Sequence, residues 1–123
     1  MEKESIYTDK APAAIGPYSQ AIRSGNMLFV SGQIAADLAQ NGDIVAETLK
    51  VMENMGAILN DAGFDFHNIV KTTIFLKDMN QFIQVNEVYA RFFSKDFPAR
   101  ETVEVARLPK DVNVEISCIA IAS

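Results

Sequence analysis

The spacing of apolar residues changes along this 123-residue chain, and the order of those changes constrains the fold more than any other feature. Over residues 45–62 the apolar positions recur every three or four residues, as on one face of a helix. Gly63 follows, where a helix would end. Residues 26–33 instead show the pattern of a strand, and residues 69–76 are rich in β-branched side chains, which favour strands.

The remaining elements complete an α+β pattern. Asp78 is a candidate N-cap for a second helix, whose apolar face would consist of Phe82, Val85, Tyr89 and Phe92. Two C-terminal strands are expected at 101–108 and 112–121, joined by the polar turn 109–111, with further strands at 18–23 and near Ile6. This order predicts a single domain spanning residues 1–123, in which two helices cover one face of a sheet.

Both faces of the predicted sheet carry apolar side chains. In the strands, one alternating set contains Leu28, Val30, Ile74, Cys118 and Ala120, and the other contains Met27, Phe29, Phe75, Ile119 and Ile121. Helices on one face would leave the other apolar face in water, which monomers rarely tolerate. We therefore expect the chain to self-associate through that face.

Charge and terminal sequence narrow the class of partner. The net charge of −5 and the pI near 4.7 oppose binding to a phosphate backbone, so we expect no nucleic-acid partner. Residues 1–6 are charged where a signal peptide would be apolar, and no apolar run reaches spanning length. A cytoplasmic protein without membrane contact is expected.

The common catalytic constellations are missing from the sequence. His67 is the one histidine and falls in a helix-to-strand connection, so a solvated or capping role is favoured. Cys118 is the one cysteine, which excludes an intrachain disulfide, and its apolar strand position favours an inert core thiol. The glycines match no phosphate loop or dinucleotide fingerprint. No metal and no organic cofactor are therefore expected.

A few polar residues occur at positions where the pattern predicts an apolar residue or the start of a strand. Glu115 lies inside an apolar strand, either at an edge, in an ion pair with a nearby arginine, or in a site. Arg100 precedes a strand and is either a solvated loop charge or a carboxylate ligand. Arg107 favours a salt bridge to Asp111 or Glu104, and Tyr18 alone would be a half-buried aromatic packed under a turn.

Several long motifs, in order, carry a resemblance to a known family. They are the runs at 11–21 (APAAIGPYSQA), 31–33 (SGQ), 70–78 (VKTTIFLKD), 85–86 (VN), 98–100 (PAR) and 103–111 (VEVARLPKD). Together they closely resemble the reactive intermediate deaminase A family, also called the YjgF/YER057c/UK114 family. The match covers nearly the whole chain.

The resemblance implies a fold, an assembly and an activity. It implies a chorismate-mutase-like α+β subunit with a mixed sheet, forming a homotrimer with sites in clefts between subunits. It also implies hydrolysis of 2-imino acids and their enamine tautomers, such as 2-iminobutanoate and 2-iminopropanoate, to 2-oxo acids and ammonia. These intermediates are released by pyridoxal-phosphate-dependent dehydratases, and the hydrolysis itself requires no cofactor.

The resemblance also assigns roles to individual residues. The family's carboxylate-clamping arginine falls on Arg100 and its water-orienting glutamate on Glu115. Its substrate-binding positions fall on Tyr18, Ser31, Asn86 and Thr102. Many relatives read Ser-Cys after Pro-Ala-Arg where this chain has Glu101-Thr102, so a cysteine nucleophile is unavailable and Thr102 offers only its hydroxyl or carbonyl.

Another class of function remains open on sequence alone. A regulatory module could use the same clefts to bind small 2-oxo or amino acids without turnover. Relatives have also been described as translation inhibitors with ribonuclease activity, which the acidic charge and the lone His67 support poorly.

Overall fold

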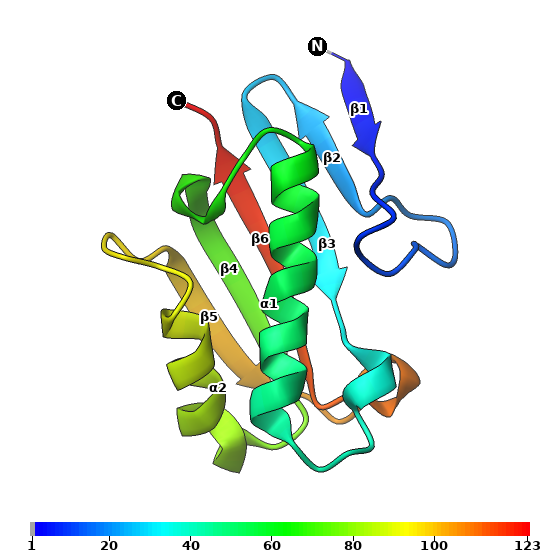
Figure 1. The fold of residues 1–123 in the computed structure, drawn as a ribbon, viewed down its shortest axis with the longest axis vertical. Coiled ribbons are helices and arrows are strands. Elements are labelled where there is room, and N and C mark those ends of the chain that lie inside the picture. Colours follow the sequence, from blue (N-terminus) through cyan, green and yellow to red (C-terminus); the bar gives the residue numbers. More distant parts are fainter. Residues whose placement is uncertain (1) are drawn as a thin grey trace.

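The computed structural model describes residues 2–123, which form one mixed six-stranded sheet with two α-helices on one face (Figure 1). The strands are β1 (Lys3–Ile6), β2 (Ala21–Ser24), β3 (Met27–Gln33), β4 (Ile69–Leu76), β5 (Ala99–Glu104) and β6 (Val114–Ile121). The helices are α1 (Ile44–Asp61) and α2 (Phe82–Ala90). The predicted α+β class with a mixed sheet is confirmed.

The strand order is β1-β2-β3-β6-β4-β5, and only β4 and β5 pair in parallel. α2 belongs to the crossover that joins these two parallel strands. The turn predicted at 109–111 does lie between the last two strands, but these strands are not neighbours in the sheet, and the expected strand at 101–108 is shorter. β5 ends at Glu104, and the chain then returns to place β6 in the middle of the sheet, with Leu108 buried against Val112 on the way.

Helix α1 forms the centre of the core. Asp43 caps its start by accepting a hydrogen bond from the Ala46 amide at 3.0 Å. Gly63 ends it with a left-handed φ of 82°, and the Phe64 amide then reaches back to the Leu59 carbonyl at 2.8 Å. Its buried side chains pack on the sheet and include Val51, Met52, Met55, Ile58 and Leu59.

The opposite face of the sheet is apolar and uncovered. Alternate residues of the central strands, such as Ile74 and Ile116, are fully buried under the helices. On the other face Phe29, Val103 and Ile121 are 40%, 39% and 36% exposed. The predicted two-faced apolar pattern is confirmed, and this uncovered face is a surface that a further protein chain could bury.

Candidate functional site

Strand β3 carries a bulge at its C-terminal end that shapes the candidate site. Val30 pairs with Cys118 and Gln33 with Ile116, so Ser31 and Gly32 together face the single residue Ser117 of β6. Such a bulge re-aims the side chains around it. Glu115, further along β6, occupies the space that Gly32 leaves, because a Cβ atom at position 32 would lie 2.7 Å from its Cδ.

The loop between β1 and β2 is held over this bulge by one buried amide. Gln20 accepts a hydrogen bond from the Thr8 amide at 2.7 Å and donates to the carbonyls of Thr8 and Pro12 at 3.1 and 2.9 Å. Ser31 ties the bulge to the same loop, since its hydroxyl donates to the Ser19 carbonyl at 2.6 Å. The loop is thereby fixed beside β3 and presents Tyr18 to solvent.

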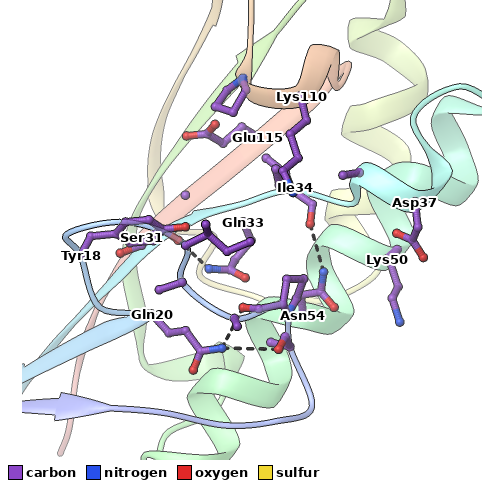
Figure 2. A pocket seen from close by; sticks show the side chains of 18 of the residues that line it. Tyr18, Gln20, Ser31, Gln33, Ile34, Asp37, Lys50, Asn54, Lys110 and Glu115 are labelled. Atoms are coloured by element: carbon purple, nitrogen blue, oxygen red, sulfur yellow. Dashed lines mark hydrogen bonds between the residues drawn. The ribbon is translucent and has the colours of Figure 1, made fainter.

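An open cleft of about 1010 Å³ lies between this loop, the bulge and the turn at 109–111 (Figure 2). Three predicted site residues, Tyr18, Ser31 and Glu115, line it together. Tyr18 is 54% exposed, so about half of its surface is buried, as expected. The exposed part of Tyr18 lines the cleft, where it is available to a ligand.

Glu115 is a partly buried carboxylate without an ion-pair partner in the described residues 2–123. Burial raises its pKa above the ordinary glutamate value, because desolvation disfavours the charged form. Within residues 2–123 the arginine side chains that form ion pairs do so with Glu4, Glu87 and Asp111. The alternative of an ion pair between Glu115 and a nearby arginine is therefore wrong, and this carboxylate is available for a water or a ligand.

Arg100 lies elsewhere, at the edge strand β5 under helix α2. Its Nη1 donates a hydrogen bond to Asn86 Oδ1 at 2.6 Å. Its Cζ atom lies 5.6 Å from the ring centre of Phe82 and 5.1 Å from that of Tyr89. The alternative of a freely solvated loop charge is wrong, because the guanidinium is partly buried and held on three sides.

The predicted site residues thus form two groups on opposite faces of the sheet. Arg100 and Thr102 pair in register with Thr72 and Ile74, whose side chains are buried under the helices. Glu115 pairs with Phe75, on the uncovered face. One chain therefore brings together Tyr18, Ser31 and Glu115, and separately Asn86, Arg100 and Thr102. The hydroxyl of Thr102 is buried without a hydrogen-bond partner in residues 2–123.

Arg107, His67 and Cys118 have the surroundings that the sequence predicts. Arg107 Nε contacts Asp111 Oδ1 at 3.0 Å, which holds the pKa of that carboxyl below its usual range. His67 is exposed in the connection before β4, with Nδ1 3.3 Å from Asp65. Cys118 is buried, and burial raises the pKa of its thiol to about 12. These observations confirm that the histidine is exposed and that the thiol belongs to the core, and the raised pKa favours an unreactive thiol.

Among the cleft residues that sequence reasoning missed, Gly32 and Lys110 have special backbone roles. Gly32 was read only as part of a motif, although its lack of a side chain makes room for Glu115. Lys110 lines the cleft from a turn in which its own φ is 55° and that of Asp111 is 54°. These left-handed conformations are uncommon for residues with side chains, and the Arg107–Asp111 contact helps to hold them. In the sequence, the two consecutive polar residues after Pro109 were the available indication of this turn.

No group of three or more potential metal ligands occurs among residues 2–123. In the same part of the chain, neither helix is long and apolar enough to cross a bilayer.

Comparison with known proteins identifies the family. Residues 8–122 match the family described as Endoribonuclease L-PSP. A RutC family protein of Pyrococcus horikoshii is 52% identical over 122 residues, covering 96% of this chain and 97% of that protein. The crystal structure of YyfA from Yersinia pestis, described as a member of the Rid family, is 47% identical, with a TM-score of 0.93 over 98% of this chain and all of that one.

This chain belongs to the YjgF/RidA family. Another solved relative, Escherichia coli TdcF with bound serine, is 42% identical, with a TM-score of 0.90 over 98% of this chain and 99% of that one. The RidA fold therefore extends over the whole described chain, and both groups of predicted site residues belong to it.

Proposed function

We propose that this RidA-family protein hydrolyses 2-imino acids and their enamine tautomers, such as 2-iminobutanoate and 2-iminopropanoate, to 2-oxo acids and ammonia. The observation that carries the proposal is the presence, in one chain, of a preorganised arginine and a partly buried carboxylate without an ion-pair partner in residues 2–123. These two groups fit a small acid substrate that is attacked by water. The reaction needs no metal and no organic cofactor. Each residue's contribution follows from its contacts.

Arg100 would bind the substrate carboxylate. A guanidinium has five N–H donors, and Asn86 occupies one, so a pair of parallel donors remains for a bidentate contact. Fixing the carboxylate fixes the adjacent C=N carbon, which converts the attack of water into a positioned reaction. Thr102, on the same strand face, would supply a hydroxyl that has no hydrogen-bond partner among the described residues.

Glu115 would act as the general base. Its carboxylate would orient a water and accept a proton from it as the water attacks the protonated imine carbon, which gives a carbinolamine. It would return that proton to the nitrogen and then accept the hydroxyl proton as the C–N bond breaks, the C=O bond forms and ammonia leaves. A raised pKa makes the carboxylate a better proton acceptor. Tyr18 and Ser31 line the same cleft and would enclose the substrate.

The two groups lie on opposite faces of one sheet, so a single substrate would need two chains. We propose a homotrimer in which the α2–β5 edge of one subunit meets the Glu115 cleft of the next. A head-to-tail contact between unlike surfaces closes into a ring, and the uncovered apolar face supplies area to bury. The stoichiometry of three comes from the family resemblance.

A second candidate is a module that binds small amino or 2-oxo acids without turnover. The observation that favours it is the solved TdcF relative with bound serine, because serine has no imine to hydrolyse. Ribonuclease activity has less physical support, since the chain carries a net charge of −5 and its one histidine is exposed beside Asp65.

One coupled assay separates hydrolysis from binding. A threonine dehydratase generates 2-iminobutanoate, and semicarbazide traps the imine that survives. We expect the protein to lower the trapped product while total 2-oxobutanoate is unchanged. Trapped product that does not respond to the protein would exclude the deaminase, and binding of 2-oxobutanoate or serine in the same preparation would then support the binding module.

A further inference from the structure

One face of α2 contacts the guanidinium of Arg100 through three side chains. Asn86 accepts its hydrogen bond at 2.6 Å. The rings of Phe82 and Tyr89 have their centres 5.6 and 5.1 Å from its Cζ atom. Positions four and three residues apart lie on the same side of a helix. The helix therefore presents one hydrogen-bond acceptor and two aromatic rings to a single cation.

Tyr89 is itself fixed from the sheet. Its hydroxyl lies 2.8 Å from the hydroxyl of Thr72, and the two side chains are 3% and 0% exposed. Thr72 is the register partner of Arg100 in the parallel β4–β5 pair, so both side chains lie under α2. The ring of Phe93 adds a further contact to Tyr89, with the centroids 4.9 Å apart. Tyr89 thus has a fixed ring plane beside the guanidinium.

A fixed plane matters for a carboxylate ligand. Arginine has a long side chain that samples many rotamers, and a bidentate contact requires one orientation of its planar donors. Aromatic faces attract and stack a guanidinium, and the Asn86 oxygen fixes which edge remains free. Preorganisation of this kind lowers the cost of ordering the side chain on binding.

We propose that Phe82 and Tyr89, with Thr72 acting through the Tyr89 hydroxyl, are positioning residues that set the plane of the Arg100 guanidinium and thereby its selectivity for carboxylate ligands. They act through Arg100 and do not touch the substrate. The inference rests on the proposed function, because it takes the ligand to be a small 2-oxo or 2-imino acid.

Selectivity is measured by calorimetric titration with 2-oxobutanoate and with its uncharged amide. Thr72→Val removes the hydroxyl and keeps the shape, and Phe82→Leu removes a ring. Each should lower the preference for the carboxylate by about fivefold. Thr72→Ser retains the hydroxyl and should keep the wild-type preference. Phe92→Leu is the matched control, because Phe92 packs on Phe66 in the neighbouring aromatic cluster.

A second measurement needs no ligand. In protein with ¹⁵N-labelled arginine, the Nη resonances of Arg100, assigned by their loss in Arg100→Lys, report rotation of the guanidinium. Rotation should be slow in the wild type and in Phe92→Leu, and faster in Thr72→Val and Phe82→Leu. Tyr89→Phe removes only the hydroxyl and provides the same test if Thr72→Val does not fold.

The outcomes separate this inference from the proposed function. Unchanged rotation and unchanged selectivity in folded Phe82→Leu and Tyr89→Phe would overturn the positioning role. Faster rotation in these variants would support the restraint of Arg100. If the wild type then prefers neither compound, the role of Arg100 in carboxylate selectivity is overturned and the proposed ligand class is contradicted.

Discussion

The side chain of Glu115 packs directly against the backbone of Gly32. A Cβ atom at position 32 would lie 2.7 Å from Cδ and 2.9 Å from Cγ of Glu115, closer than real Cβ contacts allow. Glycine in the bulge of β3 is therefore a condition for the position of the carboxylate. The bulge and the proposed general base are one structural unit, although Gly32 and Glu115 are 83 positions apart in the sequence.

Gly32→Ala should displace Glu115 and lower imine hydrolysis by about tenfold or more, because a base must lie within hydrogen-bond reach of the attacking water. The semicarbazide assay measures the loss. Gly63→Ala is the matched control. It introduces a side chain at a φ of 82° with nothing within 4 Å, so it should reduce thermal stability and leave activity unchanged. Wild-type activity in folded Gly32→Ala would remove Glu115 from the mechanism.

Glu115→Gln should abolish most of the activity and yet stabilise the fold at neutral pH. Burial raises the pKa of Glu115 in the folded protein, so the folded state binds the proton more tightly than the unfolded chain does. The wild type therefore gains stability as the pH falls through the raised pKa, whereas the glutamine variant lacks this gain. In thermal unfolding, the glutamine variant should have the higher Tm at neutral pH. This difference in Tm should shrink as the pH falls toward 4.5, the ordinary pKa of a glutamate side chain. A difference that grows on acidification would contradict the assigned direction.

The local elements could be predicted because their causes are local. Periodicity and backbone preference predict the apolar face of α1, its end before Gly63 and the strand β4. The position of β6 could not be predicted, because strand neighbours depend on contacts between distant segments. A polar turn at 109–111 is compatible with a hairpin and also with the longer return that the chain makes.

The candidate site, like the fold, could be predicted only in part from the sequence. Arg100, Glu115, Tyr18, Ser31, Asn86 and Thr102 were found through the family resemblance, and residue chemistry alone left the first two undecided. The sequence could not show that these residues lie on two faces of the sheet, because that depends on the β4–β5 and β4–β6 registers. Phe82 and Tyr89 fit an apolar helix face equally well, so their contact with Arg100 had no sequence signature.

Neither His67 nor Cys118 should be needed for activity. His67→Ala should retain most of the hydrolysis rate, since the imidazole of His67 is exposed and lies beside Asp65, away from the cleft residues. Cys118→Ser should also retain it but lose stability, because it buries a hydroxyl. In the native wild type the Cys118 thiol, with a pKa of about 12, should resist a thiol reagent until the protein unfolds. A large fall in rate for folded His67→Ala would show that the acid–base assignment is incorrect.

Arg100→Lys should be nearly as impaired as Arg100→Ala. A lysine keeps the charge but cannot make two parallel hydrogen bonds to one carboxylate, and it loses the planar contacts to Phe82 and Tyr89. The loss of charge-assisted bonds corresponds to at least about tenfold in kcat/KM. The coupled assay with semicarbazide trapping measures both variants. If folded, trimeric Arg100→Ala is as active as the wild type, the carboxylate clamp is wrong.

Mixing two inactive variants tests whether the site forms between subunits. Arg100→Ala retains Glu115, and Glu115→Gln retains Arg100, so a mixed assembly can contain sites with both intact residues only if they come from different chains. Unfolding and refolding an equal mixture should restore roughly one quarter of wild-type activity, since each head-to-tail site then has a one-half chance of the right subunit on each side. The control is the same mixture without refolding, which should stay inactive while subunits do not exchange.

The mixing result is decisive because the two arrangements predict different outcomes. A site within one subunit would give no recovery at any mixing ratio, since every chain lacks one of the two residues. Sedimentation equilibrium on the same samples checks the assembly, and a stable monomer at micromolar concentration would exclude the proposed interface directly. Recovery that peaks at equal amounts of the two variants would place Arg100 and Glu115 on either side of one substrate. The separation of these residues on opposite faces of the sheet would then be a requirement of the ring and not an obstacle to catalysis.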